Sequence, residues 1–248
     1  MTTTSVITVC YNAASTLART IESVLLQSHP VDQYVIIDGG STDGTVDIIK
    51  SYVDRFDGRL QWISEKDTGI YDAMNKGIKR ATGDIIGILN ADDWYEYNAI
   101  QHILDKAEGN PPGVYYGLMR KWQDGKERMV VREHHNFLCQ DMIPHPATFV
   151  HRDIYRDHGV FDDSYALAAD YELMLRFSRK NVHFYTVDSI LANFAIGGAS
   201  VKRARKMWLE VINIRRHYGT LSRAQYTVFR LLIEARSFVE RFMLKERL

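Results

Sequence analysis

The sequence predicts an α/β fold with a mostly parallel central sheet flanked by helices, and three observations support this. First, short apolar segments alternate with amphipathic segments over residues 6–106. Second, glycine or polar residues follow each apolar segment, as they do where parallel strands end. Third, the 248 residues are 46% hydrophobic, which is enough to bury the core of one such domain. Functional side chains are therefore expected beyond the carboxyl ends of the strands.

Four strand–helix pairs are expected in the first part of the chain. The strands are residues 6–11, 34–38, 60–64 and 84–89, and the helices are residues 15–26, 45–56, 70–81 and 97–106. Right-handed crossovers between consecutive strands would make this part of the sheet parallel. Further on, the sequence predicts a hairpin at 113–131 with its turn at 123–126, an irregular stretch at 144–150 and a helix at 166–179.

Two adjacent carboxylates, Asp92 and Asp93, are the strongest functional signal. They closely follow the apolar strand 85–89, so a buried strand would deliver oxygen ligands to the edge of the sheet. Divalent cations such as Mg²⁺ prefer oxygen ligands, and a phosphate can complete such a site. The alternative is a solvated turn that caps the next helix, because Asp is a favourable N-cap residue.

Several segments together, in their order along the chain, resemble the family 2 glycosyltransferases. They read ITVCYN at 7–12, IDGGSTDGT at 37–45, EKDTGIYDAMNKG at 65–77, NADD at 90–93, HP at 145–146 and ADYE at 169–172. The resemblance covers about residues 5–200 and implies a nucleotide-sugar-dependent enzyme of the GT-A fold, with a Rossmann-like sheet. The expected domains are a glycosyltransferase domain at 1–200 and a basic amphipathic helical extension at 201–248.

The resemblance implies a donor site at the strand ends. Tyr11 and Asn12 would shape the nucleoside pocket, and Asp38 would accept the uracil N–H, since buried base edges need hydrogen-bond partners. A plain turn former is the alternative for Asp38, and a helix N-cap is the alternative for Asp67. The expected nucleotide-sugar-binding residues are Val9, Tyr11, Asn12, Asp38, Asp67, Asn75, Asn90, Ala91 and Asp92.

The resemblance also implies Mn or Mg as a cofactor. The metal motif of the family is Asp-X-Asp, and Asn90 stands at its first position here without a charge. The ion is therefore expected on Asp92, with Asp93 as a helper. There it would take up negative charge as the diphosphate leaves.

Asp170 matches the position of the general base of the family. It would deprotonate the acceptor hydroxyl, and the anomeric centre would invert. The alternative is a carboxylate that only complements the positive end of a helix. His145 is an expected contact to the diphosphate or the acceptor; as a histidine between two prolines it could equally be an ordered loop residue.

The C-terminal part of the chain is basic. Residues 202–248 contain twelve Lys and Arg against four Asp and Glu, although the whole chain has no net charge. Apolar residues recur at helical spacing over 228–242. The expected partner is an anionic inner-membrane surface, and packing of this stripe on the domain is the alternative. A nucleic-acid binder is disfavoured, because no recognition module accompanies the basic residues.

Residues 193–200 contain paired glycines and resemble a loop that follows the catalytic domain in related bacterial enzymes. A mobile cover over the diphosphate and a plain linker both fit this composition. Cys10 and Cys139 have no metal-type spacing and fit reduced cysteines of a cytoplasmic protein. The start of the chain lacks a signal peptide, and no run of eighteen apolar residues occurs in the sequence.

The expected function is transfer of a sugar from a nucleotide-sugar, with UDP as the expected nucleotide, to a lipid-linked glycan acceptor in cell-surface polysaccharide biosynthesis. The expected location is the cytoplasmic face of the inner membrane. A non-catalytic nucleotide-binding module is the main alternative, with Asn90 marking lost metal binding. A dinucleotide dehydrogenase is disfavoured, since no Gly-X-Gly-X-X-Gly follows the first strand. The sequence predicts no oligomeric state.

Overall fold

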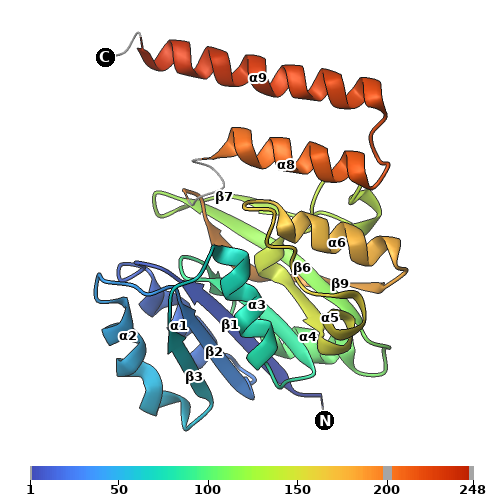
Figure 1. The fold of residues 1–248 in the computed structure, drawn as a ribbon. Coiled ribbons are helices and arrows are strands. Elements are labelled where there is room, and N and C mark those ends of the chain that lie inside the picture. Colours follow the sequence, from blue (N-terminus) through green and yellow to red (C-terminus); the bar gives the residue numbers. More distant parts are fainter. Residues whose placement is uncertain (1, 198–202, 246–248) are drawn as a thin grey trace.

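The computed structural model describes residues 2–197 and 203–245, and side chains up to Arg236. Within these residues, nine strands form one sheet in the order β3-β2-β1-β4-β8-β6-β9-β5, with β7 paired to β6 (Figure 1). The strands are β1 Thr4–Cys10, β2 Gln33–Asp38, β3 Leu60–Ser64, β4 Ile85–Asn90, β5 Trp94–Tyr95, β6 Gly113–Gln123, β7 Lys126–Val131, β8 Thr148–His151 and β9 His183–Ala195.

Helices cover both faces of this sheet because its central strands are apolar on both sides. On β1, Val6 belongs to the core under one face and Ile7 to the core under the other, as alternation along a strand requires. The first core takes in α1 Leu17–Leu25, α2 Thr45–Tyr52 and α4 Ala99–Ala107. The second takes in α3 Ile70–Arg80, α5 Arg152–His158, α6 Ala169–Arg179 and α8 Ala204–His217.

The predicted parallel half of the sheet is confirmed. β1 pairs in parallel with β2 and β4, and β2 pairs in parallel with β3. The 3-10 turn η1 Val53–Phe56 follows α2, so the expected helix at 45–56 is tightened at its end. The hairpin at 113–131 is also confirmed, as β6 and β7. The carboxyl ends of β1, β2 and β4 therefore lie at one edge of the sheet, where ligands bind in such folds.

Strands β8 and β9 are not predicted by the sequence, and β8 begins within the stretch at 144–150 that was expected to be irregular. β8 is antiparallel to both β4 and β6, whereas β9 runs parallel to β6. Buried and partly exposed residues do not alternate regularly along β9, so its hydrophobic pattern does not predict a strand. The short 3-10 helices η2 His135–Phe137 and η3 His145–Ala147 lie in the stretch between β7 and β8.

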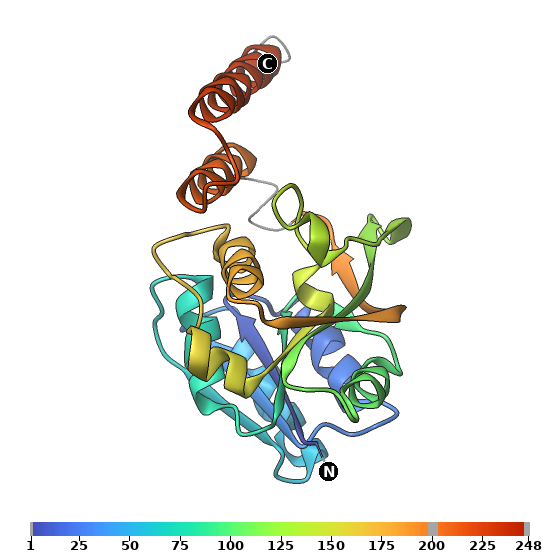
Figure 2. The ribbon, with the colours of Figure 1, turned by 90° about the vertical axis from the view of Figure 1, so that its right-hand side faces the viewer.

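The C-terminal helices are stacked one above the other. α8 packs on the domain through the buried residues Ile212 and Ile214, and α9 Arg223–Lys245 lies on α8 (Figures 1 and 2). The expected loop at 193–200 begins as the end of β9, up to Ala195, and residues 194–197 line the pocket at the strand ends. Residues 198–200 of that loop and the expected domain division at 200 lie outside the described residues. The stripe at 228–242 is described only to Arg236, and there Val228, Leu231 and Leu232 are exposed. No described helix is long and apolar enough to cross a membrane.

Candidate active site

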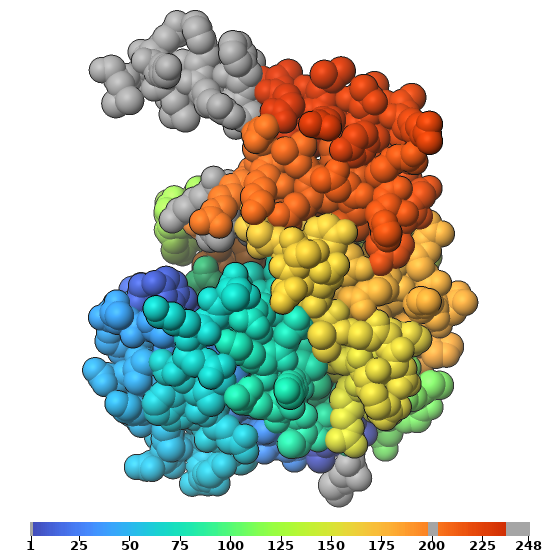
Figure 3. Space-filling view, in the orientation of Figure 1, coloured from blue at the N-terminus to red at the C-terminus, as the bar shows by residue number. Residues whose placement is uncertain are grey.

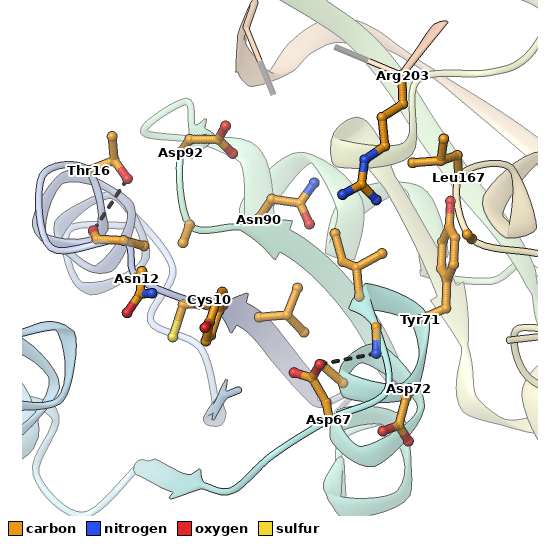
Figure 4. Close-up of a pocket in the computed structure, with 18 of the residues that line it drawn as sticks. Cys10, Asn12, Thr16, Asp67, Tyr71, Asp72, Asn90, Asp92, Leu167 and Arg203 are labelled. Atoms are coloured by element: carbon orange, nitrogen blue, oxygen red, sulfur yellow. Dashed lines mark hydrogen bonds between the residues drawn. The ribbon is translucent and has the colours of Figure 1, made fainter. Parts of the chain in front are cut away.

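A cleft of about 920 Å³ opens at the carboxyl ends of β1 and β4. Figure 4 shows its walls, which come from segments far apart in the sequence. One wall is formed by residues 9–16 and 90–92, and the facing wall by 67–73, 163–167 and Arg203. Among the expected donor-binding residues, the following line the cleft: Val9, Tyr11, Asn12, Asp67, Asn90, Ala91 and Asp92.

Asp92 is held at the cleft by a tight turn that follows β4. The backbone N–H of Asp93 donates to the carbonyl of Asn90 at 3.1 Å, which closes the turn. Arg19 of α1 donates to the backbone carbonyl of Asp92 at 2.9 Å and stacks on the Trp94 ring, 3.6 Å from its centroid. The side chain of Asp92 forms no ion pair within the described residues. Burial raises the pKa of this carboxyl.

Asp93, the expected metal helper, does not line the cleft. It is fully buried and accepts a hydrogen bond from the backbone N–H of Ala195 on β9 at 3.1 Å. Its other carboxylate oxygen has no partner within the described residues. Burial, reinforced by the charge of Asp92, raises the pKa of Asp93 well above its usual range. Because this carboxyl is fully buried, does not line the cleft and is bonded to the backbone of β9, the geometry favours a structural role.

The far end of the cleft forms a narrower hollow between Tyr11 and Asp67. This hollow, of about 410 Å³, is also lined by Gly39 and Gly40. A Cβ on Gly39 would lie 2.5 Å from a carboxylate oxygen of Asp67, so only glycine lets that side chain occupy its place. Asp67 also accepts from the backbone N–H of Gly69 at 3.1 Å, which makes it a turn residue before α3. The N-cap of α3 is Gly69, so Asp67 is not the helix N-cap that the sequence offered as an alternative, and its contact with a nucleoside stays a prediction.

Asp38 differs from the expected base contact, because it is fully buried and does not line the cleft. Its carboxylate accepts hydrogen bonds from the Ser64 hydroxyl at 2.6 Å, from the backbone N–H groups of Gly40 and Ser41, and from the Ser41 hydroxyl. Burial opposes the charge, but these hydrogen bonds outweigh it and lower the pKa of Asp38. In this structure Asp38 holds the loop after β2, and that loop shapes the hollow.

Asn75 is a second departure from the expected donor site. It lies on α3 and does not line the cleft. Its side-chain amide donates to the backbone carbonyl of Phe161 at 2.9 Å and accepts from the backbone N–H of Phe161 at 3.0 Å. This pair of bonds fixes the loop before α6 to α3. Asn75 therefore serves as a structural link between α3 and that loop.

His145 lies behind the wall of the cleft and does not line it. Its ring meets that of Phe161 edge to face, with centroids 5.9 Å apart, and its buried Nε2 has no partner within the described residues. Burial lowers the pKa of His145, although the charge of Asp170 opposes this. Burial therefore favours the neutral form of the imidazole, and the ring does not line the cleft.

Asp170 stands in the first turn of α6, next to the facing wall. Its Oδ1 accepts from the Tyr71 hydroxyl at 2.9 Å, and Tyr71 itself lines the cleft from α3. Tyr71 is buried and stacks on Phe161, with centroids 5.4 Å apart. Burial, together with the charge of Asp170, raises the pKa of Tyr71 well above its ordinary value, so its hydroxyl remains a donor at neutral pH. The phenol connects the expected base to the cleft.

Arg203 is a cleft residue that the sequence analysis did not identify. Figure 4 shows its guanidinium pointing into the cleft between Asn90 and Leu167. Within the described lining it is the only Lys or Arg, against the carboxylates of Asp67, Asp72, Asp92 and Asp163. The basic cluster at 202–206 was the available signal, but nothing in the sequence says that it folds back over the strand ends.

Comparison with known proteins gives a family. The family described as glycosyl transferase family 2 matches residues 5–178. The uncharacterized glycosyltransferase Rv1514c of Mycobacterium tuberculosis is 31% identical over 186 residues, which are 70% of this chain and 68% of that protein. The putative teichuronic acid biosynthesis glycosyltransferase TuaG of Bacillus subtilis is 38% identical over 102 residues, 41% of this chain and 40% of its own.

Solved structures share the fold at lower identity. S. aureus TarS 1-349 in complex with UDP-GlcNAc has a TM-score of 0.69 at 16% identity, over 96% of this chain and 73% of that one. The chain spans 39% of a longer TarS structure. The mannosyltransferase PcManGT from Pyrobaculum calidifontis, in complex with GDP-Man and Mn²⁺, has a TM-score of 0.70 at 16% identity, over 96% and 69% of the two chains. The expected GT-A fold is thereby confirmed, and the family match over most of the chain shows that this protein belongs to glycosyl transferase family 2.

Proposed function

We propose that this glycosyltransferase transfers a sugar from a UDP-sugar to a lipid-linked glycan acceptor, with inversion at the anomeric carbon, in cell-surface polysaccharide biosynthesis. The observation that carries the proposal is one cleft with the carboxylate of Asp92 on one wall and Tyr71 on the other, where the Tyr71 hydroxyl donates to Asp170 behind that wall. The likeness to TuaG, named for teichuronic acid biosynthesis, supports a polysaccharide product. The UDP-GlcNAc complex of TarS supports a UDP donor.

The donor side of the cleft consists of residues 9–12, 67–69 and 90–92. In this proposal the base enters the hollow between Tyr11 and Asp67, and the ribose and phosphates lie along Asn90 and Asp92. Arg203 would pair with the diphosphate, because a guanidinium binds phosphate oxygens in a bidentate way. The other charged residues of the lining are the carboxylates of Asp67, Asp72, Asp92 and Asp163, so an anionic donor would need a bound cation to offset their repulsion.

The residues fit a bound Mn or Mg. No group of three or more His, Cys, Asp or Glu that could hold a metal occurs in the described residues, so most ligands would come from the donor phosphates and water. Asp92 would be the protein ligand, since its carboxylate faces the cleft and forms no ion pair within the described residues (Figure 4). A cation bound there supplies positive charge to the departing diphosphate.

The acceptor side of the cleft consists of residues 70–73 and 163–167, with Asp170 behind them. Asp170 would take the proton of the acceptor hydroxyl as that oxygen bonds to the anomeric carbon. The bond from that carbon to the diphosphate oxygen breaks in the same displacement, and UDP leaves. Tyr71 would hold one carboxylate oxygen of Asp170 and so leave the other for the acceptor.

A panel of UDP-, GDP- and dTDP-sugars tests this proposal. The full chain is expected to hydrolyse one UDP-sugar slowly in the presence of Mn²⁺ or Mg²⁺, and that donor is expected to raise its Tm. A chain that is stabilised by UDP-sugars but turns none over would instead be a nucleotide-binding module, which is the reading that Asn90 favours. A preference for GDP-sugars would contradict the UDP assignment.

We further propose that α9 attaches the enzyme to an anionic membrane surface. The apolar residues Val228, Leu231 and Leu232 of α9 are 55%, 64% and 59% exposed, and the residues from 202 onward carry the surplus of basic charge. Flotation with liposomes that contain anionic lipid should lift the full chain. The double change Leu231→Glu and Leu232→Glu should abolish flotation, whereas Met129→Glu, an exposed apolar residue of β7, should not. Equal flotation of all three would contradict membrane binding through α9.

A further inference from the structure

The carboxylate of Glu210 on α8 caps the segment that forms the acceptor side of the cleft. It accepts hydrogen bonds from three consecutive backbone N–H groups, those of Ala166, Leu167 and Ala168, at 3.2, 2.8 and 3.1 Å. Glu210 lies 42 to 44 residues beyond these partners in the chain. Its side chain is only 13% exposed, so water competes little for these bonds.

The N-terminus of α6 has no side-chain cap from its own N-cap residue. α6 begins at Ala169 with Ala168 as its N-cap, and an alanine side chain cannot accept a hydrogen bond from the first N–H groups. Glu210 instead accepts from the N–H of Ala168 itself and from the two N–H groups before it, and its negative charge lies close to the positive end of the α6 dipole. α6 carries Asp170 in its first turn, directly after the capped segment.

Glu210 also lies close to the groups on which the proposed chemistry depends. Its charge contributes to the raised pKa of Tyr71, after burial and the charge of Asp170. Residues 166 and 167 line the cleft themselves. In the space-filling view, the orange α8 rests on the yellow segment that precedes α6 (Figure 3).

The rest of α8 keeps Glu210 in register with α6. Tyr218, just after α8, donates its hydroxyl to Glu172 of α6, and Glu172 is in turn paired with Arg176 at 3.0 Å. Arg179 donates to the backbone carbonyl of Tyr218 at 3.1 Å. These contacts join α6 to the C-terminal end of α8, so α8 cannot shift along α6 without breaking them.

We propose that Glu210 is a positioning residue of the active site: it fixes the 166–168 segment, and through it Asp170, in the geometry that the transfer requires. The inference rests on the proposed function, because it concerns the base of that reaction. The family match ends at residue 178, so α8 lies outside the part of the chain that the family describes. The active site would thus be completed by a helix beyond the family domain.

The test compares Glu210→Ala and Glu210→Gln with wild type in Mn²⁺-dependent hydrolysis of the UDP-sugar found in the panel. Small displacements of a catalytic group cost large factors in rate, so kcat should fall about tenfold or more for Glu210→Ala. Glu210→Gln keeps one acceptor oxygen and should lose less. KM for the donor and the Kd of UDP should stay within about twofold, because Glu210 does not touch the donor side.

Glu234→Ala is the matched control. Glu234 of α9 forms a two-bond pair with Arg205 of α8, at 2.6 and 2.9 Å, away from the cleft. Its removal should lower Tm without a change in kcat. If Glu210→Ala has the kcat of wild type, or changes only the KM for the donor, the positioning role of Glu210 is overturned and the proposed function stands. A wild-type chain that hydrolyses no donor would overturn the proposed function, and this inference with it.

Discussion

The donor side and the acceptor side of the cleft are built in different ways. The donor side lies at the ends of β1 and β4 and in the turn before α3, all within residues 9–92. The acceptor side joins α3 to a loop at 163–167, and the loop is held by Glu210 of α8. Backbone pairing of parallel strands fixes the first arrangement, with Val9 of β1 beside Asn90 of β4, whereas the second depends on side-chain hydrogen bonds between helices and a loop. Changes on the two sides should therefore have separable effects.

The largest effect is expected at the acceptor side, for Asp170→Asn. The amide keeps the shape and can still accept from Tyr71, but it cannot take a proton, so kcat should fall about a thousandfold. The Kd of UDP should not change, because the donor side is untouched. Steady-state kinetics with isothermal titration of UDP would check this, with the exposed Asp188→Asn as control. Near wild-type turnover would remove Asp170 as the base.

Asp92→Asn should impair the function of the donor side of the cleft. It removes the proposed ligand of the cation, and a loss of about 3 kcal/mol in transition-state stabilisation corresponds to roughly a hundredfold in rate. The stimulation by Mn²⁺ should disappear together with the activity. A metal titration of wild type and variant would show this. A variant that keeps the wild-type response to Mn²⁺ would place the ion elsewhere.

Tyr71→Phe should have an intermediate effect on the acceptor side. It removes one hydrogen bond to Asp170 but keeps the ring stacked on Phe161. A hydrogen bond to a charged group contributes about 1.5–3 kcal/mol, so we expect roughly a tenfold or larger fall in kcat with an unchanged donor KM. If donor KM rises instead, Tyr71 acts on the nucleotide rather than on Asp170.

Asp93→Asn should have the smallest effect on activity and a measurable one on stability. The pKa of Asp93 is raised in the folded chain, so the unfolded chain loses this proton at a lower pH. Folding stability then falls as pH rises from the unfolded pKa of about 3.9 towards the folded value. The variant has no ionisable group at this position and does not lose stability in this way. Its Tm should therefore equal or exceed that of wild type between pH 5 and pH 8. Thermal melts across that range test it, and loss of metal-dependent activity would show that Asp93 is a ligand after all.

Much of the donor side could be predicted from the sequence because local patterns determine it. The run of apolar residues at 85–89 and the following Asn90, Ala91 and Asp92 are enough to put these side chains at the edge of a parallel sheet. The sequence could not show which of two adjacent aspartates faces the cleft. That choice depends on the N–H of Ala195, a residue of β9 that lies 102 positions away.

The acceptor side was less predictable for the same physical reason. Asp170 could be found from its motif, but its partner Tyr71 is 99 residues away. The roles of Asn75 and Asp38 also depend on neighbours that no local pattern identifies: Phe161 in the first case, Ser64 in the second. Arg203 and Glu210 reach the site only because α8 packs on α6.

The central claim is that Asp92, and not Asp93, presents the carboxylate that meets a cation and the donor diphosphate. Crystals of the full chain grown with Mn²⁺ and UDP, measured at the manganese absorption edge, test it most directly. The account predicts one anomalous peak between Asp92 and the diphosphate, with Asp93 still bonded to Ala195. A peak on Asp93, or UDP bound outside this cleft, would contradict it.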